Sequence, residues 1–215
     1  MPRRPTTRYT NLIEDGWLDS DPGQLDVLGR LDSLALQLDG YGLPAAANGL
    51  ARLFKRNSTR KVPRSVYIWG DVGRGKTLVM DLFHDAIAPK TKRRVHFHAF
   101  MQEVHRDIHA YRKDQDKGLI DAAADPIASV AANIAAEASV LCLDEFQVKD
   151  ITDAMILGRL FQALHKAGCV IVATSNIPPD ELYRNGLNRN LFVPFIEFIQ
   201  SHFDVIQLKG PSDYR

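Results

Sequence analysis

Eight consecutive residues have the composition and spacing of a phosphate-binding loop. They read GxxxxGKT and are Gly70, Asp71, Val72, Gly73, Arg74, Gly75, Lys76 and Thr77. The pattern follows an apolar run and precedes a segment with helical spacing, which is the setting this loop requires. Glycines let several backbone N–H groups face one point, where the helix N-terminus adds positive potential. The loop therefore predicts binding of a nucleotide polyphosphate, with Lys76 on its β and γ phosphates and the Thr77 hydroxyl on Mg²⁺.

Two further groups of polar residues follow other apolar runs. Asp144 and Glu145 come directly after four apolar residues, as expected of the acidic motif that accompanies a phosphate loop. We expect Asp144 to hold the Mg²⁺ sphere and Glu145 to polarise an attacking water. Asn176 follows the next apolar run, and its amide could hydrogen-bond both that water and the γ-phosphate. The alternative for Asn176 is a turn residue before Ile177.

Arginines between Asn176 and the last apolar run could complete a hydrolytic site. A guanidinium supplied by a neighbouring subunit would neutralise charge that develops on the phosphoryl oxygens. We assign this role to Arg189, with Arg184 as the second candidate. The competing interpretation is that both are ordinary exposed arginines.

Histidine and cysteine residues are interpreted without a metal or a disulfide. His96 and His98 are two residues apart, and His105 and His109 are four apart, but no cysteine or acid completes a familiar ligand spacing. Packing or surface polarity is therefore the favoured interpretation of all four. The two cysteines, Cys142 and Cys169, lie in apolar runs and are expected to be buried and reduced, as in a cytoplasmic protein.

Composition narrows the function classes. The chain has 215 residues, 45% of them hydrophobic, which is compatible with one large α/β domain. The formal net charge is +1, so the chain has no overall field that would attract nucleic acid. No apolar stretch reaches the length of about 18 residues that a membrane span needs. We therefore expect a cytoplasmic protein and regard nucleic-acid binding as disfavoured.

Strand-like and helix-like segments alternate along the chain. Strands are expected at 65–69, 94–100, 139–143, 169–173 and 204–208. Helices are expected at 22–38, 45–55, 76–88, 103–113, 127–138, 151–167 and 191–201. This order predicts an α/β fold with a five-stranded parallel sheet covered by helices on both faces. Residues 1–63 would form a helical segment leading into a phosphate-loop core at 64–215, with the ligand at the carboxyl ends of the strands.

Four runs together resemble one family. GDVGRGKTLVMDLF (70–83), HFHAFM (96–101), LCLDEFQVKDITDAMIL (141–157) and ATSNIPPDELYRNGLNRNLFVPFI (173–196) are similar to the family of ZapE cell-division ATPases and their AFG-like relatives. The resemblance implies an AAA+ P-loop NTPase that hydrolyses ATP with Mg²⁺ between subunits of a homo-oligomer. It places Lys76 and Thr77 in Walker A, Asp144 and Glu145 in Walker B, Asn176 as sensor 1 and Arg189 as the arginine finger.

The resemblance also implies partners and a missing part. Remodelling of a protein partner, in bacteria the division machinery and its FtsZ polymer, is the implied role. Phe100 and Met101 fall where AAA+ proteins place a pore loop, although packing explains both side chains equally well. The resemblance implies that the family continues beyond the segment matching residue 215 with a helical lid domain, which we expect to be absent here. Two alternatives remain open, a P-loop kinase for a small molecule and a module that binds nucleotide with little hydrolysis.

Overall fold

The computed structural model describes residues 4–41, 62–87 and 91–210, so the helix expected at 45–55 lies outside the described residues. The strands are β1 (Ser65–Trp69), β2 (Lys92–His96), β3 (Val140–Asp144), β4 (Val170–Ser175) and β5 (Phe203–Gln207). The helices are α1 (Pro5–Glu14), α2 (Pro22–Leu38), α4 (Lys76–Ala86), α5 (Phe97–Asp116), α6 (Pro126–Glu137), α7 (Ile151–Lys166) and α8 (Val193–His202). Two short 3₁₀ helices, η1 (Pro179–Glu181) and η2 (Arg189–Leu191), precede α8. None of the helices in these ranges has the length and apolarity needed to cross a bilayer.

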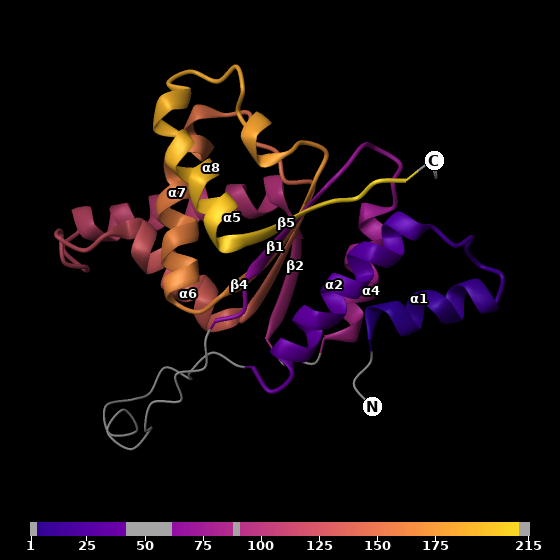
Figure 1. The fold of residues 1–215 in the computed structure, drawn as a ribbon. Helices are drawn as coiled ribbons and strands as arrows, with labels where there is room; N and C mark the ends of the chain where they lie inside the picture. Colours follow the sequence, from indigo (N-terminus) through magenta and orange to yellow (C-terminus); the bar gives the residue numbers. More distant parts are fainter. Residues whose placement is uncertain (1–3, 42–61, 88–90, 211–215) are drawn as a thin grey trace.

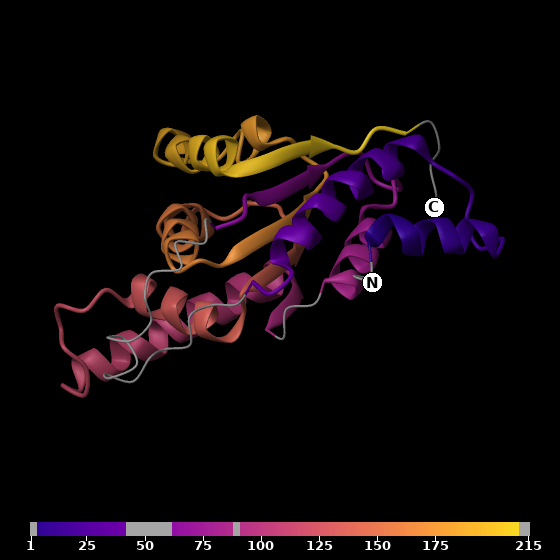
Figure 2. The same cartoon turned by 60° about the horizontal axis from the view of Figure 1, so that its bottom comes forward.

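The five strands form one parallel sheet in the order β2-β3-β4-β1-β5. The predicted α/β fold with a five-stranded parallel sheet is therefore confirmed. Because β4 lies between β1 and β3, the segments that follow these three strands meet at one edge of the sheet. Figure 2 shows β5 along one margin of the sheet.

Helices cover both faces of the sheet. Figure 1 shows α1, α2 and α4 on one side of the strands and α5 to α8 on the other. Along β1, Val66 and Ile68 pack in the cluster shared with α2 and α4, whereas Tyr67 packs in the cluster shared with α5 to α8. Alternate residues of a strand point to opposite faces, so a strand that is apolar throughout is buried on both faces.

The boundary between β2 and α5 differs from the prediction. The expected strand at 94–100 ends at His96, and α5 begins at Phe97. The seven residues alternate in polarity, but the buried residues of this segment are spaced as one helical stripe. They are Phe97, Phe100, Met101, Val104 and Ile108. The longer helical period therefore decides the local structure.

The same helix overturns the pore-loop assignment. Phe100 and Met101 are each 1% exposed and lie inside the apolar cluster of α5 to α8. Side chains buried in this way cannot grip a substrate. The packing interpretation of these two residues is therefore correct.

Helix α2 begins after the N-cap residue Asp21 and holds the N-terminal segment on the core. The Asp21 side chain accepts a hydrogen bond from the Gln24 backbone N–H at 2.9 Å, and Pro22 occupies the first turn. Tyr9 of α1 is buried, and its hydroxyl accepts from the Asp21 backbone N–H at 3.0 Å. The sequence prediction missed α1. Only Pro5 and Tyr9 are buried in it, so its apolar stripe is weak.

Candidate functional site

Backbone hydrogen bonds align the three polar segments at the edge of the sheet. The Gly70 N–H donates to the Ser175 carbonyl at 3.2 Å, which ties the loop after β1 to the end of β4. The Phe146 N–H donates to the Thr174 carbonyl at 2.7 Å, which ties the segment after β3 to the other side of β4. The phosphate loop, Asp144-Glu145 and Asn176 are consequently held next to one another.

The loop at 70–77 has the backbone conformation that its glycines permit. Gly73 and Gly75 have φ values of 81° and 83°, in the left-handed region. Gly75 is also the N-cap of α4, so the first N–H groups of this helix face the space in front of the loop. A Cβ at Gly75 would lie 2.5 Å from Nε2 of Gln24, so α2 leaves no room for a larger residue there.

Lys76 lies folded onto its own loop. Its Nζ donates to the carbonyl oxygens of Gly70 at 2.8 Å and of Asp71 at 2.6 Å. Desolvation lowers the pKa of Lys76, and the nearby Asp71 carboxylate acts in the opposite direction. An ammonium held here by neutral carbonyls is available to phosphate oxygens, which would form stronger charge-assisted hydrogen bonds.

A cavity of about 490 Å³ lies in front of the loop. The loop and the start of α4 line one wall, from Val72 to Leu78. Leu18, Asp19 and Gln24 line it from the N-terminal segment, and Glu145, Thr174 and Asn176 line it from the ends of β3 and β4. The volume lies within the range of about 300 to 1,000 Å³ that small-molecule and cofactor sites occupy. Lys76, Thr77, Glu145 and Asn176, expected to act together, therefore share one cavity.

Asp144, the last residue of β3, is not among the described residues that line this cavity. Its side chain is 9% exposed, and Oδ2 accepts from Nε of Arg94 at 2.6 Å. Its Oδ1 accepts from the Thr174 hydroxyl at 3.4 Å. The Arg94 guanidinium also forms an ion pair with Asp81 of α4. The carboxylate is thus buried with partners on both of its oxygens, as a buried charge requires.

Glu145 has a different environment although it is the next residue. Its side chain is 80% exposed, and its backbone has a φ of 56°, which non-glycine residues rarely adopt. Its N–H donates to the Thr174 hydroxyl at 3.3 Å. Such backbone strain costs about 1–3 kcal/mol and is concentrated at functional sites. The turn allows one neighbour to be buried while the other reaches the cavity.

Asn176 is fixed by the residue before it. The Ser175 hydroxyl donates to the Phe146 carbonyl at 2.7 Å and accepts from the Ile177 N–H at 3.1 Å. Asn176 lines the nucleotide-sized cavity and also a second cavity of about 490 Å³, which Glu145 shares. Asn176 therefore lies where the two cavities adjoin.

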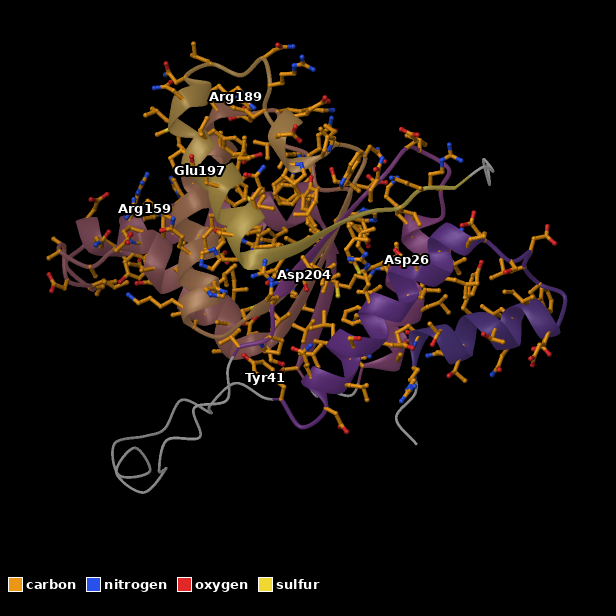
Figure 3. The ribbon with its side chains drawn as sticks, in the orientation of Figure 1. Asp26, Tyr41, Arg159, Arg189, Glu197 and Asp204 are labelled. Carbon is orange, nitrogen blue, oxygen red and sulfur yellow. The ribbon has the colours of Figure 1, made fainter. Side chains whose placement is uncertain are left out.

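The two candidate finger arginines lie apart from this group. Neither is among the described residues that line the cavity at the loop. Arg189 donates from Nη2 to the Asp180 carbonyl at 2.6 Å, and its buried Nε has no hydrogen-bond partner within the described ranges. Arg184 is exposed and lies 3.5 Å from Glu181. Figure 3 shows Arg189 on the side of the sheet that carries α8, away from Asp26 of α2.

Sequence reasoning missed three residues that shape the site, Gln24, Arg94 and Thr174. Gln24 was interpreted only as part of a helix start, yet its buried amide donates to the Arg74 carbonyl at 3.2 Å. Arg94 begins one predicted strand and Thr174 directly follows another. Their spacing in the sequence does not indicate that both bond Asp144. A signal for Thr174 did exist, because it immediately precedes Ser175 and Asn176 at a strand end.

The remaining histidines and cysteines play other parts. His96 occupies the N-cap position of α5 without a side-chain hydrogen bond to the helix, and His98 lies on that helix instead of on the expected strand. His105 contacts Asp153 of α7 at 2.6 Å. Cys142 and Cys169 are buried free thiols, as expected, and burial raises the pKa of each to about 12. Both thiols therefore stay protonated and pack as small apolar side chains.

Comparison with known proteins identifies relatives over almost the whole chain. A sequence model of the family described as AFG1-like ATPase matches residues 3–215. The Escherichia coli K12 protein "Cell division protein ZapE" is 42% identical over 218 residues, covering 98% of this chain and 56% of that protein. "Lactation elevated protein 1 homolog B" of Danio rerio is 49% identical over 250 residues, covering 99% and 50%. The chain spans about half the length of these relatives.

Solved structures share the fold at low sequence identity. DnaI matches with a TM-score of 0.54 and 15% identity, covering 89% of this chain and 88% of that one. AMPPCP-bound DnaA from Aquifex aeolicus matches with a TM-score of 0.50 and 13% identity, covering 93% and 51%. The chain therefore has the α/β fold of P-loop NTPases of the AAA+ type.

Proposed function

The chain belongs to the AFG1-like ATPase family, and we propose that it binds ATP with Mg²⁺ and hydrolyses it at the cavity in front of residues 70–77. One observation carries the proposal. Lys76, Glu145 and Asn176, which follow three adjacent strands, line the same cavity. A phosphate-binding cation, a candidate base and an amide are thus available to a single ligand.

The residues would divide the chemistry among them. The N–H groups at the start of α4 and the Lys76 ammonium would hold the phosphates, because fixed dipoles and a cation stabilise the charge that develops on transfer. Glu145 would polarise a water on the γ-phosphate side, and Asn176 would orient this water. The Thr174 hydroxyl would keep Glu145 in place, because it accepts a hydrogen bond from the Glu145 backbone N–H.

Two oxygen donors suit the metal. Mg²⁺ prefers oxygen ligands and usually takes one or two from the protein, with phosphates and waters completing its shell. Thr77, at the start of α4, offers a hydroxyl, and Asp144 offers a carboxylate. When bound, Mg²⁺ would neutralise phosphate charge. The donor set therefore fits this ion.

The wider role is drawn from the family. By similarity to the relative named "Cell division protein ZapE", we propose a homo-oligomer in the cytoplasm that remodels a protein partner of the division machinery, for which FtsZ is the candidate. Arg189 would act on the site of a neighbouring copy, since it lies outside the cavity of its own chain. The lid that the resemblance implies would couple hydrolysis to movement.

One structural observation favours a second function. The second cavity adjoins the γ-phosphate side, because Glu145 and Asn176 line it as well. A P-loop kinase would need an acceptor pocket in this place. Its lining includes Asp150 and Asp153, so an acceptor there would carry cationic or hydroxyl groups.

Product analysis separates these functions. Purified chain is incubated with Mg²⁺ and ATP without any acceptor, and released phosphate and bound nucleotide are measured. The proteins compared are wild type, Lys76→Ala, Glu145→Gln and Lys113→Ala, which replaces an exposed lysine as a control. Hydrolysis that is lost in Lys76→Ala and Glu145→Gln but kept in Lys113→Ala supports the ATPase. Phosphate transfer only after a metabolite is added supports the kinase. Tight binding without turnover in every variant supports a binding module and contradicts our proposal.

A further inference from the structure

We propose that Arg94 competes with Mg²⁺ for Asp144, so that the metal enters this site only together with a nucleotide. The inference rests on the proposed Mg²⁺–ATP function and extends it to the control of metal binding. Arg94 would be a positioning residue, since it acts through Asp144 and is not among the described residues that line the nucleotide cavity.

The register of the sheet places Arg94 beside the metal-binding carboxylate. Arg94 of β2 pairs with Cys142 of β3, two residues before Asp144 and on the same face of the sheet. From there Nε of Arg94 lies 2.6 Å from Oδ2 of Asp144. One of the two carboxylate oxygens that a metal shell could use is therefore already bonded to a cation.

The same guanidinium reaches the helix that carries the other metal donor. Its Nη1 forms an ion pair with Asp81 of α4. Asp81 is four residues after Thr77, so both lie on the same face of this helix. Arg94 thus bridges the two elements between which a metal would bind.

The charge and burial of Arg94 and Asp144 determine how tightly a divalent cation would be held. Arg94 and Asp144 have side-chain exposures of 22% and 9%, so solvent screens their interaction little. Two carboxylates bound to one guanidinium leave about one negative charge, whereas removing Arg94 would leave about two. A divalent cation would be held more tightly by the second arrangement. In wild type, the phosphates must add the missing negative charge before the metal is retained.

The alternative is that Arg94 only joins β2, β3 and α4. This interpretation predicts a loss of stability with no change in metal dependence. Arg93 provides a matched comparison, because it is the adjacent arginine on the same strand and forms an ion pair with Glu103, on α5 at the other face of the sheet. Replacing Arg93 removes a similar ion pair without touching Asp144.

The test measures metal binding directly. The wild-type chain, Arg94→Gln and Arg93→Gln are titrated with Mn²⁺ without nucleotide, and free Mn²⁺ is followed by electron paramagnetic resonance. A second titration measures the Mg²⁺ concentration that gives half-maximal binding of a fluorescent ATP analogue. We expect Arg94→Gln alone to retain Mn²⁺ without nucleotide and to lower the half-saturating Mg²⁺ concentration about tenfold, the effect of one charge-assisted hydrogen bond.

Asp81→Asn should change the half-saturating Mg²⁺ concentration in the opposite direction. This variant also tests the proposal if Arg94→Gln does not fold. Asp81 is 52% exposed, so its replacement is tolerated. Arg94 would then neutralise Asp144 alone, and the half-saturating Mg²⁺ concentration would rise severalfold. If wild type binds the analogue without Mg²⁺, the proposed metal site itself fails. If wild type requires Mg²⁺ but the variants that fold keep its Mg²⁺ dependence, the role of Arg94 is overturned.

Discussion

Asp144 and Glu145 are neighbours in the chain with opposite exposures, and Thr174 accounts for the difference. Its hydroxyl donates to the Asp144 carboxylate and accepts from the Glu145 N–H, at 3.4 Å and 3.3 Å. One buried side chain therefore fixes the carboxylate assigned to the metal and the turn that presents the candidate base. Among the residues of the site, Thr174 links the two chemical roles most directly.

Replacing Thr174 tests this link. Thr174→Val keeps the shape of the side chain but removes both hydrogen bonds, each of which involves a charged group or a strained turn. We expect kcat to fall about tenfold to a hundredfold, since hydrogen bonds to charged groups contribute about 1.5–3 kcal/mol. ATP affinity should stay near that of wild type, because the Thr174 hydroxyl bonds Asp144 and Glu145 at the end of β3 and not the phosphate loop.

Steady-state phosphate release measures kcat, and equilibrium nucleotide binding on the same preparations measures ATP affinity. Thr174→Ser is the matched control, since it restores the hydroxyl and should recover most of the rate. Unchanged kcat in Thr174→Val would contradict the role given to the residue.

At the scale of elements, short apolar runs and their ends were enough to predict the sheet. Four of the five strands lie within two residues of their expected positions. Three of these, β1, β3 and β4, are buried on both faces and are therefore apolar runs. The end of β2 was wrong because seven alternating residues also fit the start of the helical stripe from Phe97. Contacts such as Gln24 with Arg74 or Arg94 with Asp144 depend on the strand order and on tertiary packing, which the spacing of residues does not contain.

The packing of α7 on α8 predicts a dependence of stability on pH. Burial lowers the pKa of His165 below its usual 6.5, and the nearby His202 lowers it further. Nδ1 of His165 is buried without a hydrogen-bond partner in the described part of the chain. The unfolded chain therefore binds this proton more tightly than the folded one.

The unfolding free energy should consequently be unaffected by this group above pH 6.5 and should decrease as pH falls below that value toward the folded-state pKa. Urea unfolding between pH 5 and 8 measures the effect. His165→Phe should reduce the slope of the profile, leaving the part due to His84, whose pKa burial also lowers, whereas His109→Gln, at an exposed position on α5, should keep the full slope. An identical slope in His165→Phe and wild type would contradict the assignment.

The family and the fold of the whole molecule are those that the sequence predicted. The arrangement of subunits is a proposal. The cavity at the loop contains the phosphate-binding lysine, a carboxylate and an amide from one chain, but no arginine from 184 or 189 among its described lining residues. Arg74 of the loop itself lines this cavity, so Arg189 would act as a second guanidinium, supplied by another copy. The sequence predicted that Arg189 serves a neighbouring copy, and this stays a proposal, supported by its position outside the cavity of its own chain.

Mixing two inactive variants tests this arrangement. Arg189→Ala keeps its own ATP site, whereas Glu145→Gln binds ATP and keeps Arg189. We expect Arg189→Ala alone to lose activity by about a hundredfold or more and the mixture to regain part of it. Arg184→Ala serves as the comparison, with activity near that of wild type. No recovery in the mixture, with mixed oligomers verified, would contradict action between subunits.

The central claim is that this chain transfers the γ-phosphate of ATP to water activated by Glu145. The test is single-turnover hydrolysis in ¹⁸O-labelled water, followed by mass analysis of the phosphate and the ADP. The control variant is Glu137→Gln, at an exposed position on α6. We expect one solvent oxygen in the released phosphate, none in ADP, and a rate about a hundredfold lower in Glu145→Gln alone. Phosphate without solvent oxygen, or an equal rate in Glu145→Gln, would contradict it.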